Sequence, residues 1–161
     1  MTRFIPGALA ACAVLVAAPA AHAVQLCAWM TETVGEDDLH EVAVFMQADE
    51  DFDFYYMMKG EGFTSEGMRA HSPGSGTFVL HAKTPDKPWG FGATLSGPGQ
   101  IDIIAEVHKY PKDVFADEPP PLITSFTFHR DVPEGETKAP ATLAAKQCKT
   151  VEPSHAFENH D

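Results

Sequence analysis

The chain has 161 residues, 44% of them hydrophobic, and its 23 acidic and 11 basic side chains give a formal net charge of −12. A surface this acidic repels phosphate backbones and anionic lipid headgroups, so nucleic acids and membrane surfaces are disfavoured as partners. The length suits one domain that buries roughly two-thirds of the surface exposed by its unfolded chain.

The first 23 residues have the layout of a secretory signal peptide. Arg3 precedes an apolar run from Ala8 to Ala18, and the small residues Ala21-His22-Ala23 supply a cleavage site. The run is too short and too weakly hydrophobic to remain as an anchor across about 30 Å of hydrocarbon. We therefore expect a periplasmic or secreted protein without membrane insertion after cleavage. Residues 24–150 would form one domain, followed by a flexible tail at 151–161.

Two cysteines remain after cleavage, Cys27 near the new N-terminus and Cys148 near the C-terminus. In an oxidising compartment a lone pair of thiols usually forms a disulfide. The rival interpretations are a redox pair, which normally has the spacing C-x-x-C, and a thiolate metal site, which needs further ligands nearby. We predict a disulfide that joins the two ends of the domain. Closing a loop of ~120 residues removes up to ~5 kcal/mol of unfolded-chain entropy.

The middle of the chain predicts a series of short strands separated by turn residues. Glycines 60, 62 and 67 and the segment His71–Gly76 act as breakers between them. Residues 139–149 could form a short helix, because they are rich in alanine, or a final strand. The predicted strands cover residues 41–48, 51–59, 77–83, 89–95, 101–110 and 122–130. This pattern predicts an all-β fold, an antiparallel β-sandwich or small barrel of about six to eight short strands, with or without the C-terminal helix.

The second of these strands is the richest in aromatic residues. Phe52, Phe54, Tyr56 and Met58 share one face and form an apolar stripe, which predicts that they line the core. Met57 lies on the opposite face, at the surface or in a cavity wall. Met57 and Met58 therefore cannot bind one copper ion together without distortion, although thioethers favour Cu(I).

Three strands carry a histidine just before their ends: His81, His108 and His129. Each histidine lies on the more polar face of its strand. If the strands were neighbours with matching ends, the imidazoles could converge with Glu106 into a zinc or copper site. The alternative is three solvated side chains. Each stands close to a basic residue that works against cation binding, and antiparallel neighbours need not bring like ends together.

Four aromatic residues could form an exposed platform for stacking on sugar rings: Trp89, Phe91, Tyr55 and Tyr110. Trp89 is the most promising of them, because it follows a proline and precedes a glycine near a turn. Aromatic residues at strand positions more often belong to the core, which is the competing interpretation.

Catalytic motifs are missing from the sequence. It has no G-x-S-x-G, H-E-x-x-H, G-x-x-x-x-G-K-[ST] or G-x-G-x-x-G pattern. We expect first a noncatalytic binding or accessory domain without a cofactor, whose partner is an unidentified small molecule, glycan or protein. The second hypothesis is a periplasmic copper- or zinc-binding protein that uses the strand-end histidines. The third is an enzyme that acts on an extracellular polymer.

Overall fold

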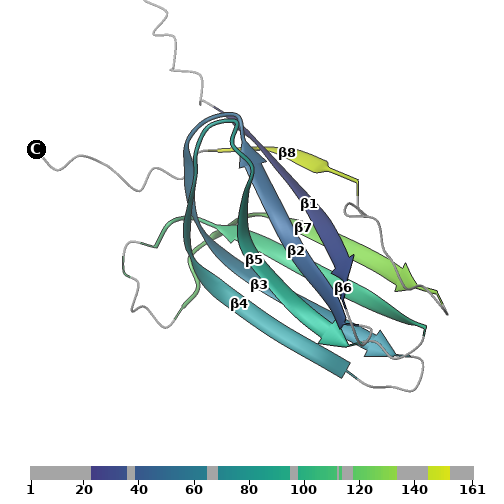
Figure 1. Cartoon of the computed structure of the whole chain (residues 1–161). Helices are drawn as coiled ribbons and strands as arrows, with labels where there is room; N and C mark the ends of the chain where they lie inside the picture. Colours follow the sequence, from purple (N-terminus) through teal and green to yellow (C-terminus); the bar gives the residue numbers. More distant parts are fainter. Residues whose placement is uncertain are drawn as a thin grey trace, which may run out of the picture.

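The computed structural model describes residues 23–35, 39–64, 69–94, 98–111, 113, 118–133 and 145–152. Within these residues, eight strands form two antiparallel sheets that face each other as a β-sandwich (Figure 1), with the strand orders β5-β2-β1-β8 and β4-β3-β6-β7. No helix that could cross a membrane occurs among them. The predicted all-β sandwich is thus confirmed, with eight strands. The strands are β1 (Val24–Val34), β2 (Leu39–Ala48), β3 (Phe52–Thr64), β4 (Arg69–Leu80), β5 (Asp86–Thr94), β6 (Gly99–His108), β7 (Leu122–Val132) and β8 (Gln147–Val151).

The chain passes repeatedly between the two sheets. Strands β1 and β2, β3 and β4, and β6 and β7 are antiparallel neighbours within a sheet. The chain changes sheet after β2, β4, β5 and β7. The last strand, β8, lies beside the first, β1 (Figure 1). The sheets are therefore interleaved in sequence, and neither can form from one continuous part of the chain.

Alternation along the strands builds the core. On β3, Phe52, Phe54 and Met58 are at most 1% exposed, and Tyr56 packs against them. The predicted apolar stripe is confirmed, and Met57 is half-buried on the opposite face. Other strands contribute inward-facing side chains of similar character. They include Leu26, Met30, Val44, Met46, Ile101, Ile103, Phe126 and Phe128.

Two large rings of β5 pack against glycines of the other sheet. Trp89 and Phe91 are buried and stack with their ring centroids 5.3 Å apart. A Cβ atom at Gly60 would lie 2.6 Å from the Trp89 ring and 2.5 Å from the Phe91 ring, and one at Gly74 would lie 2.3 Å from the Trp89 ring. These two glycines therefore provide the space that the stacked rings fill.

Two glycine-rich segments that the sequence predicts as breakers lie inside strands, so this part of the prediction is wrong, and Gly67 lies outside the described residues. Gly60 and Gly62 belong to β3, and His71–Gly76 forms the middle of β4, whereas the sequence predicts a start at residue 77. β4 is an edge strand, and proline is tolerated there because its missing N–H can face away from the ladder. Contact with the rings of β5 accounts for Gly60. The end of this predicted strand shifts too, since β4 stops at Leu80 rather than at residue 83.

The strands at the two ends of the chain differ from the predicted set. β1 is not among the predicted strands, because Glu32 occupies an inward position and interrupts the apolar alternation. Residues 147–149 belong to β8, which favours the strand alternative for that region. Residues 139–144, the predicted signal peptide apart from Ala23, and tail residues 153–161 lie outside the described residues.

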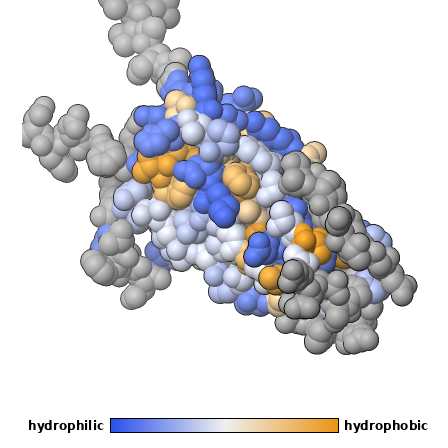
Figure 2. Space-filling model, in the orientation of Figure 1, coloured by the Kyte–Doolittle hydropathy of each residue, from blue (hydrophilic) through white to orange (hydrophobic). Residues whose placement is uncertain are grey.

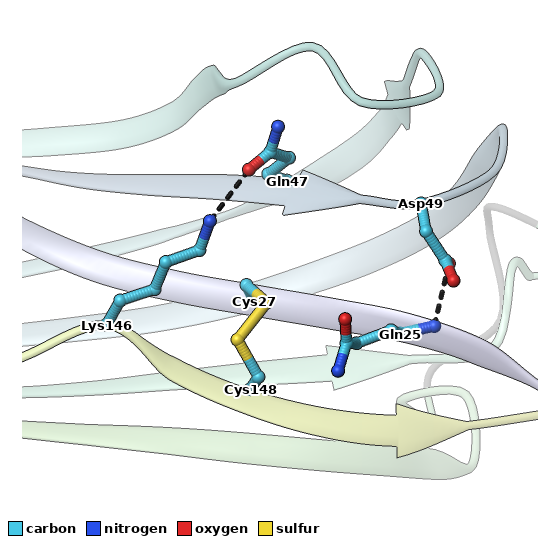
Figure 3. The surroundings of a disulfide bond; sticks show 6 residues. All are labelled: Gln25, Cys27, Gln47, Asp49, Lys146 and Cys148. Atoms are coloured by element: carbon cyan, nitrogen blue, oxygen red, sulfur yellow. Dashed lines mark hydrogen bonds between the residues drawn. A yellow bond between two sulfur atoms is a disulfide. The ribbon is translucent and has the colours of Figure 1, made fainter.

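The predicted disulfide between Cys27 and Cys148 is present. It joins β1 to β8, and the two cysteines stand directly opposite each other in the strand register (Figure 3). On the other side of β1, the backbone N–H of Gln25 donates a hydrogen bond to Asp49 Oδ1 over 2.8 Å. The disulfide therefore fixes the position of the short terminal strand at the edge of its sheet.

A buried charged network links the two sheets at one end of the sandwich. Glu32 on β1 and His40 on β2 are at most 1% exposed, and the His40 Nδ1 atom is hydrogen-bonded to Glu32 Oε1. Arg130 Nε, from β7 in the opposite sheet, donates to Glu32 Oε2 over 3.3 Å. One buried carboxylate thus has partners from both sheets, which satisfies a group that would otherwise be costly to bury.

We expect Gly74→Ala to lower the free energy of unfolding by about 1–3 kcal/mol, because the new methyl group would overlap the buried Trp89 ring. Gly92→Ala is the matched control, since its Cβ would meet only Leu39 Cδ1 at 3.4 Å. Denaturant unfolding measures both variants. Equal stability of the two would show that the Trp89 ring does not depend on Gly74.

Glu32→Ala should cost about 3–5 kcal/mol of stability, because it leaves the cationic Arg130 and the buried His40 without their shared partner. Glu61→Ala removes a carboxylate of the same kind from an exposed pair with His71 and should change stability by less than about 1 kcal/mol. Thermal and denaturant unfolding of both variants checks this. A small effect at Glu32 would contradict a structural role for the network.

Candidate functional site

The outer face of the β5-β2-β1-β8 sheet carries the most distinctive surface of the described structure. Alternation turns every second residue of β1, β2 and β5 toward solvent, and the register sets them in rows across the sheet. Successive rows change from aromatic to small and then to polar. The rows are Trp29–Phe45, Thr31–Ala43–Gly90 and Thr33–Glu41–Gly92.

A hollow of about 500 Å³ lies over these rows and is lined by residues of β1, β2 and β5. Its floor is low because Ala43, Gly90 and Gly92 have little or no side chain. Gly90 and Gly92 are the outward partners of the inward Trp89 and Phe91 in the same strand. The segment Trp-Gly-Phe-Gly therefore fills the core on one side and leaves the hollow on the other. The full lining is Thr31, Thr33, Glu41, Val42, Ala43, Phe45, Lys87, Gly90, Phe91 and Gly92.

An aromatic wall borders the hollow. The rings of Trp29 and Phe45 are nearly parallel, with an interplanar angle of 12° and centroids 5.9 Å apart. Phe45 on β2 lines the hollow, and its cross-strand neighbour Trp29 on β1 does not. Trp29 therefore supports the ring that lines the hollow.

Lys146, which is close to the disulfide in sequence, packs against Trp29 on the side of the wall away from Phe45. Lys146 Nζ lies 4.9 Å from the centroid of the Trp29 ring and donates a hydrogen bond to Gln47 Oε1 over 2.8 Å (Figure 3). Lys146 precedes Cys148 by two residues, so the disulfide to Cys27 restricts where its backbone can go. A cation above an indole ring is attracted to the negative face of the ring. Lys146, Trp29 and Phe45 thus form a stack that fixes the orientation of Phe45.

A β-bulge brings Lys87 to the hollow. Between the pairs Val44–Trp89 and Met46–Asp86 the register shifts, so two residues of β5, Lys87 and Pro88, lie opposite the single residue Phe45. Bulges re-aim side chains and often occur next to binding sites. Here the bulge places Lys87 in the lining of the same hollow as Phe45.

The charged groups of the hollow balance each other. Glu41 and Lys87 are both exposed, and neither has an ion-pair partner within the part of the chain that the structure describes. The hollow therefore offers one acceptor carboxylate and one donor ammonium to a ligand. Thr31 and Thr33 add hydroxyl groups, which both donate and accept hydrogen bonds.

The four aromatic residues of the predicted platform do not share a surface. Trp89 and Phe91 are 9% and 8% exposed and face the core, because their rings occupy the space above the glycines of the other sheet. Tyr55 lies on the outer face of β3, edge-on to His108 with ring centroids 6.3 Å apart, and Tyr110 follows β6. Sequence reasoning missed Trp29 and Phe45. The alternation of side chains along β1 indicates that Trp29 faces outward, but only if the charged Glu32 is accepted as an inward-facing residue.

The structure also separates the three histidines of the predicted metal site. His108 is buried, and its Nδ1 donates to the carbonyl oxygen of Pro120 over 2.7 Å, beneath the loop before β7. His129 pairs with Asp102 in register, six residues from His108 along β6, which is roughly 20 Å at ~3.4 Å per residue. His81 follows β4 and lies 3.9 Å from an Asp51 oxygen.

Glu106, the carboxylate of the predicted metal site, lies 3.4 Å from His108 Nε2. The described ranges of the chain contain no cluster of three or more His, Cys, Asp or Glu side chains that could hold a metal ion. The separation follows from the antiparallel pairing, which places the end of β6 beside the start of β7 rather than beside its end.

Comparisons of the chain with models of protein families, with curated proteins and with solved structures found no match. The function must therefore be inferred from the residues and geometry of the chain itself. The hollow combines a supported aromatic ring, an open floor and mixed hydrogen-bonding groups, and such a combination is typical of ligand sites.

His129 should titrate above its ordinary pKa of 6.5. The hydrogen bond of its Nδ1 to Asp102 over 2.6 Å is the main cause of the raised pKa, and Asp131 adds to it. A raised pKa in the folded state stabilises the protein below pH ~6.5, and this stabilisation is lost as the pH rises through the folded-state pKa. NMR titration should show the elevated pKa of His129 and its return toward 6.5 in Asp102→Asn. An unchanged pKa in that variant would contradict the assignment.

Proposed function

We propose that this protein is an exported, noncatalytic binding or accessory module whose ligand occupies the hollow on the outer face of the β5-β2-β1-β8 sheet. The observation that carries the proposal is the alternation Trp89-Gly90-Phe91-Gly92. It leaves two side-chain-free positions in the hollow that the outward Phe45 ring borders. A sheet face that only contacts solvent does not require an open floor beside the stacked rings of Trp29 and Phe45.

The chemistry of the lining supports binding. Phe45 provides apolar area in a fixed orientation, so its ring does not have to be ordered when a ligand arrives. Thr31, Thr33, Glu41 and Lys87 provide directional contacts around it. Sites of this kind bind small ligands through apolar contact and use a few polar groups for specificity.

Export is supported by two independent features. The N-terminal sequence has the charge, apolar run and small-residue triplet of a signal peptide. The Cys27–Cys148 disulfide is compatible with an oxidising compartment such as the periplasm or the extracellular space. We place the ligand in the same compartment.

The visible surface is also compatible with a module that stays soluble while it presents a binding face. Figure 2 shows hydrophobic residues as separate patches among hydrophilic ones on this side of the molecule. Scattered apolar residues are normal on a soluble protein. Recognition by a small, mixed site therefore fits this surface better than the burial of one large apolar face.

The proposal predicts that a ligand will perturb the backbone amides of Ala43, Gly90 and Gly92. Protein labelled with ¹⁵N would be titrated with a mixed library of small polar and aromatic compounds and soluble glycans, and its amide shifts followed. Gly92→Leu should abolish these shifts at the same concentrations, because the new side chain fills the hollow where only Leu39 Cδ1 is near.

Thr77→Leu is the matched control, because it adds a similar side chain to an exposed position on β4 in the other sheet. It should leave the titration unchanged. If every compound that binds shifted amides of the β4-β3-β6-β7 sheet instead, or if Gly92→Leu bound as well as the unaltered protein, the hollow would not be the binding site.

A further inference from the structure

We infer that the ligand of the hollow is a neutral saccharide, with one face of a pyranose ring against Phe45 and with saccharide hydroxyl groups directed to Thr31, Thr33, Glu41 and Lys87. This inference rests on the proposed function and adds the chemical class of the ligand. Three properties of the hollow carry it: the shape of its apolar part, the kinds of hydrogen-bonding group around it, and its charge.

The main outward apolar group of the lining is the planar ring of Phe45, which cannot easily turn. Phe45 is backed by the nearly parallel Trp29, and the ammonium of Lys146 lies over that ring. A pyranose ring has an apolar C–H face of about the same size as a benzene ring, and such faces suit an aromatic surface held in a fixed orientation. A flexible aliphatic ligand would gain no advantage from this rigid plane.

The polar groups match hydroxyls. Glu41 can only accept hydrogen bonds, Lys87 can only donate them, and the threonine hydroxyls do both. A sugar hydroxyl donates and accepts at the same atom, so it can satisfy each of these groups in turn. An aromatic hydrocarbon of the same shape would desolvate the polar groups without replacing their hydrogen bonds to water.

The charge of the site favours a neutral ligand. Glu41 and Lys87 carry opposite charges at the same hollow, so the site has no net preference for either sign. The chain as a whole has a formal charge of −12, which repels anionic glycans such as polyuronates. Lys87 and Lys146 work against a cationic ligand near the aromatic wall.

The floor is open along the sheet, which allows a chain of sugars to extend beyond the ring that stacks on Phe45. The volume of about 500 Å³ lies within the ordinary range of small-ligand sites of ~300–1,000 Å³. Thr33, Glu41 and Gly92 form the row farthest from Phe45. They would contact the neighbouring sugar, so a disaccharide should bind better than a single sugar.

The test is an NMR titration of the full exported chain with cellobiose, maltose and N,N′-diacetylchitobiose. Digalacturonate, indole and benzoate serve as comparators. At least one neutral disaccharide should shift the amides of Ala43, Gly90 and Gly92 saturably. Phe45→Leu, which keeps an apolar side chain but removes the planar face, should weaken that binding about five- to tenfold. Phe45→Tyr should restore it, and Val79→Ala, at an exposed position of the other sheet, should leave it unchanged.

The outcomes separate this inference from the proposed function. If indole or benzoate shifts these amides and no neutral disaccharide does, the saccharide assignment is wrong and the binding site stands. Tighter binding of digalacturonate than of the neutral disaccharides would overturn the charge argument. If no compound in this panel or in the mixed library shifts the three amides, both the ligand class and the binding site are wrong. Equal binding to Phe45→Leu would refute the stacking of the sugar on that ring.

Discussion

The packing of Trp89 and Phe91 onto Gly60 and Gly74 is the contact on which the rest of the structure depends. The two rings lie between the sheets, and the glycines opposite them let the rings approach the backbone of β3 and β4. Because side chains alternate along a strand, the same inward orientation turns Gly90 outward. The core and the candidate site are therefore two faces of one short segment. A change that rotated β5 by one residue would empty the core and fill the hollow at the same time.

The disulfide extends this dependence to the edge of the sheet. Cys27 and Cys148 hold β8 beside β1 in a fixed register. Lys146, two residues earlier, then lies over Trp29, which is stacked on Phe45. A covalent bond at the edge thereby limits the motion of a ring two strands away. The same bond that reduces the entropy of the unfolded chain also helps to preorganise the aromatic wall, and preorganisation reduces what binding costs.

Much of the fold could be predicted from local patterns, and the failures share one cause. The stripe Phe52, Phe54 and Met58 and the single cysteine pair each carry a signal that needs no knowledge of neighbours. The positions of Glu32, Gly74 and Trp89 carry no such local signal. Glu32 is inside because Arg130 and His40 reach it from other strands, and Gly74 is in a strand because a ring from the opposite sheet lies against it. Trp89 follows a proline and precedes a glycine, which favours a turn locally, but tertiary contacts place it in the core.

The candidate site could not be predicted from the sequence for the same reason. Phe45 and Gly92 become neighbours of one hollow only through the pairing of β2 with β5.

The two outer faces of the sandwich have different electrostatic characters, and the difference bears on how a ligand would approach. On the outer face of the β4-β3-β6-β7 sheet, the imidazole of His129 lies between the carboxylates of Asp102 and Asp131, and the pKa of His129 is raised by them. That face therefore loses a positive charge as the pH rises through the raised pKa of His129. The hollow on the opposite sheet pairs one carboxylate with one ammonium and contains no histidine in its lining. Recognition at the hollow should therefore depend on shape and hydrogen bonding. Long-range attraction contributes little to a neutral ligand, so its association would rest on the contacts made within the hollow itself.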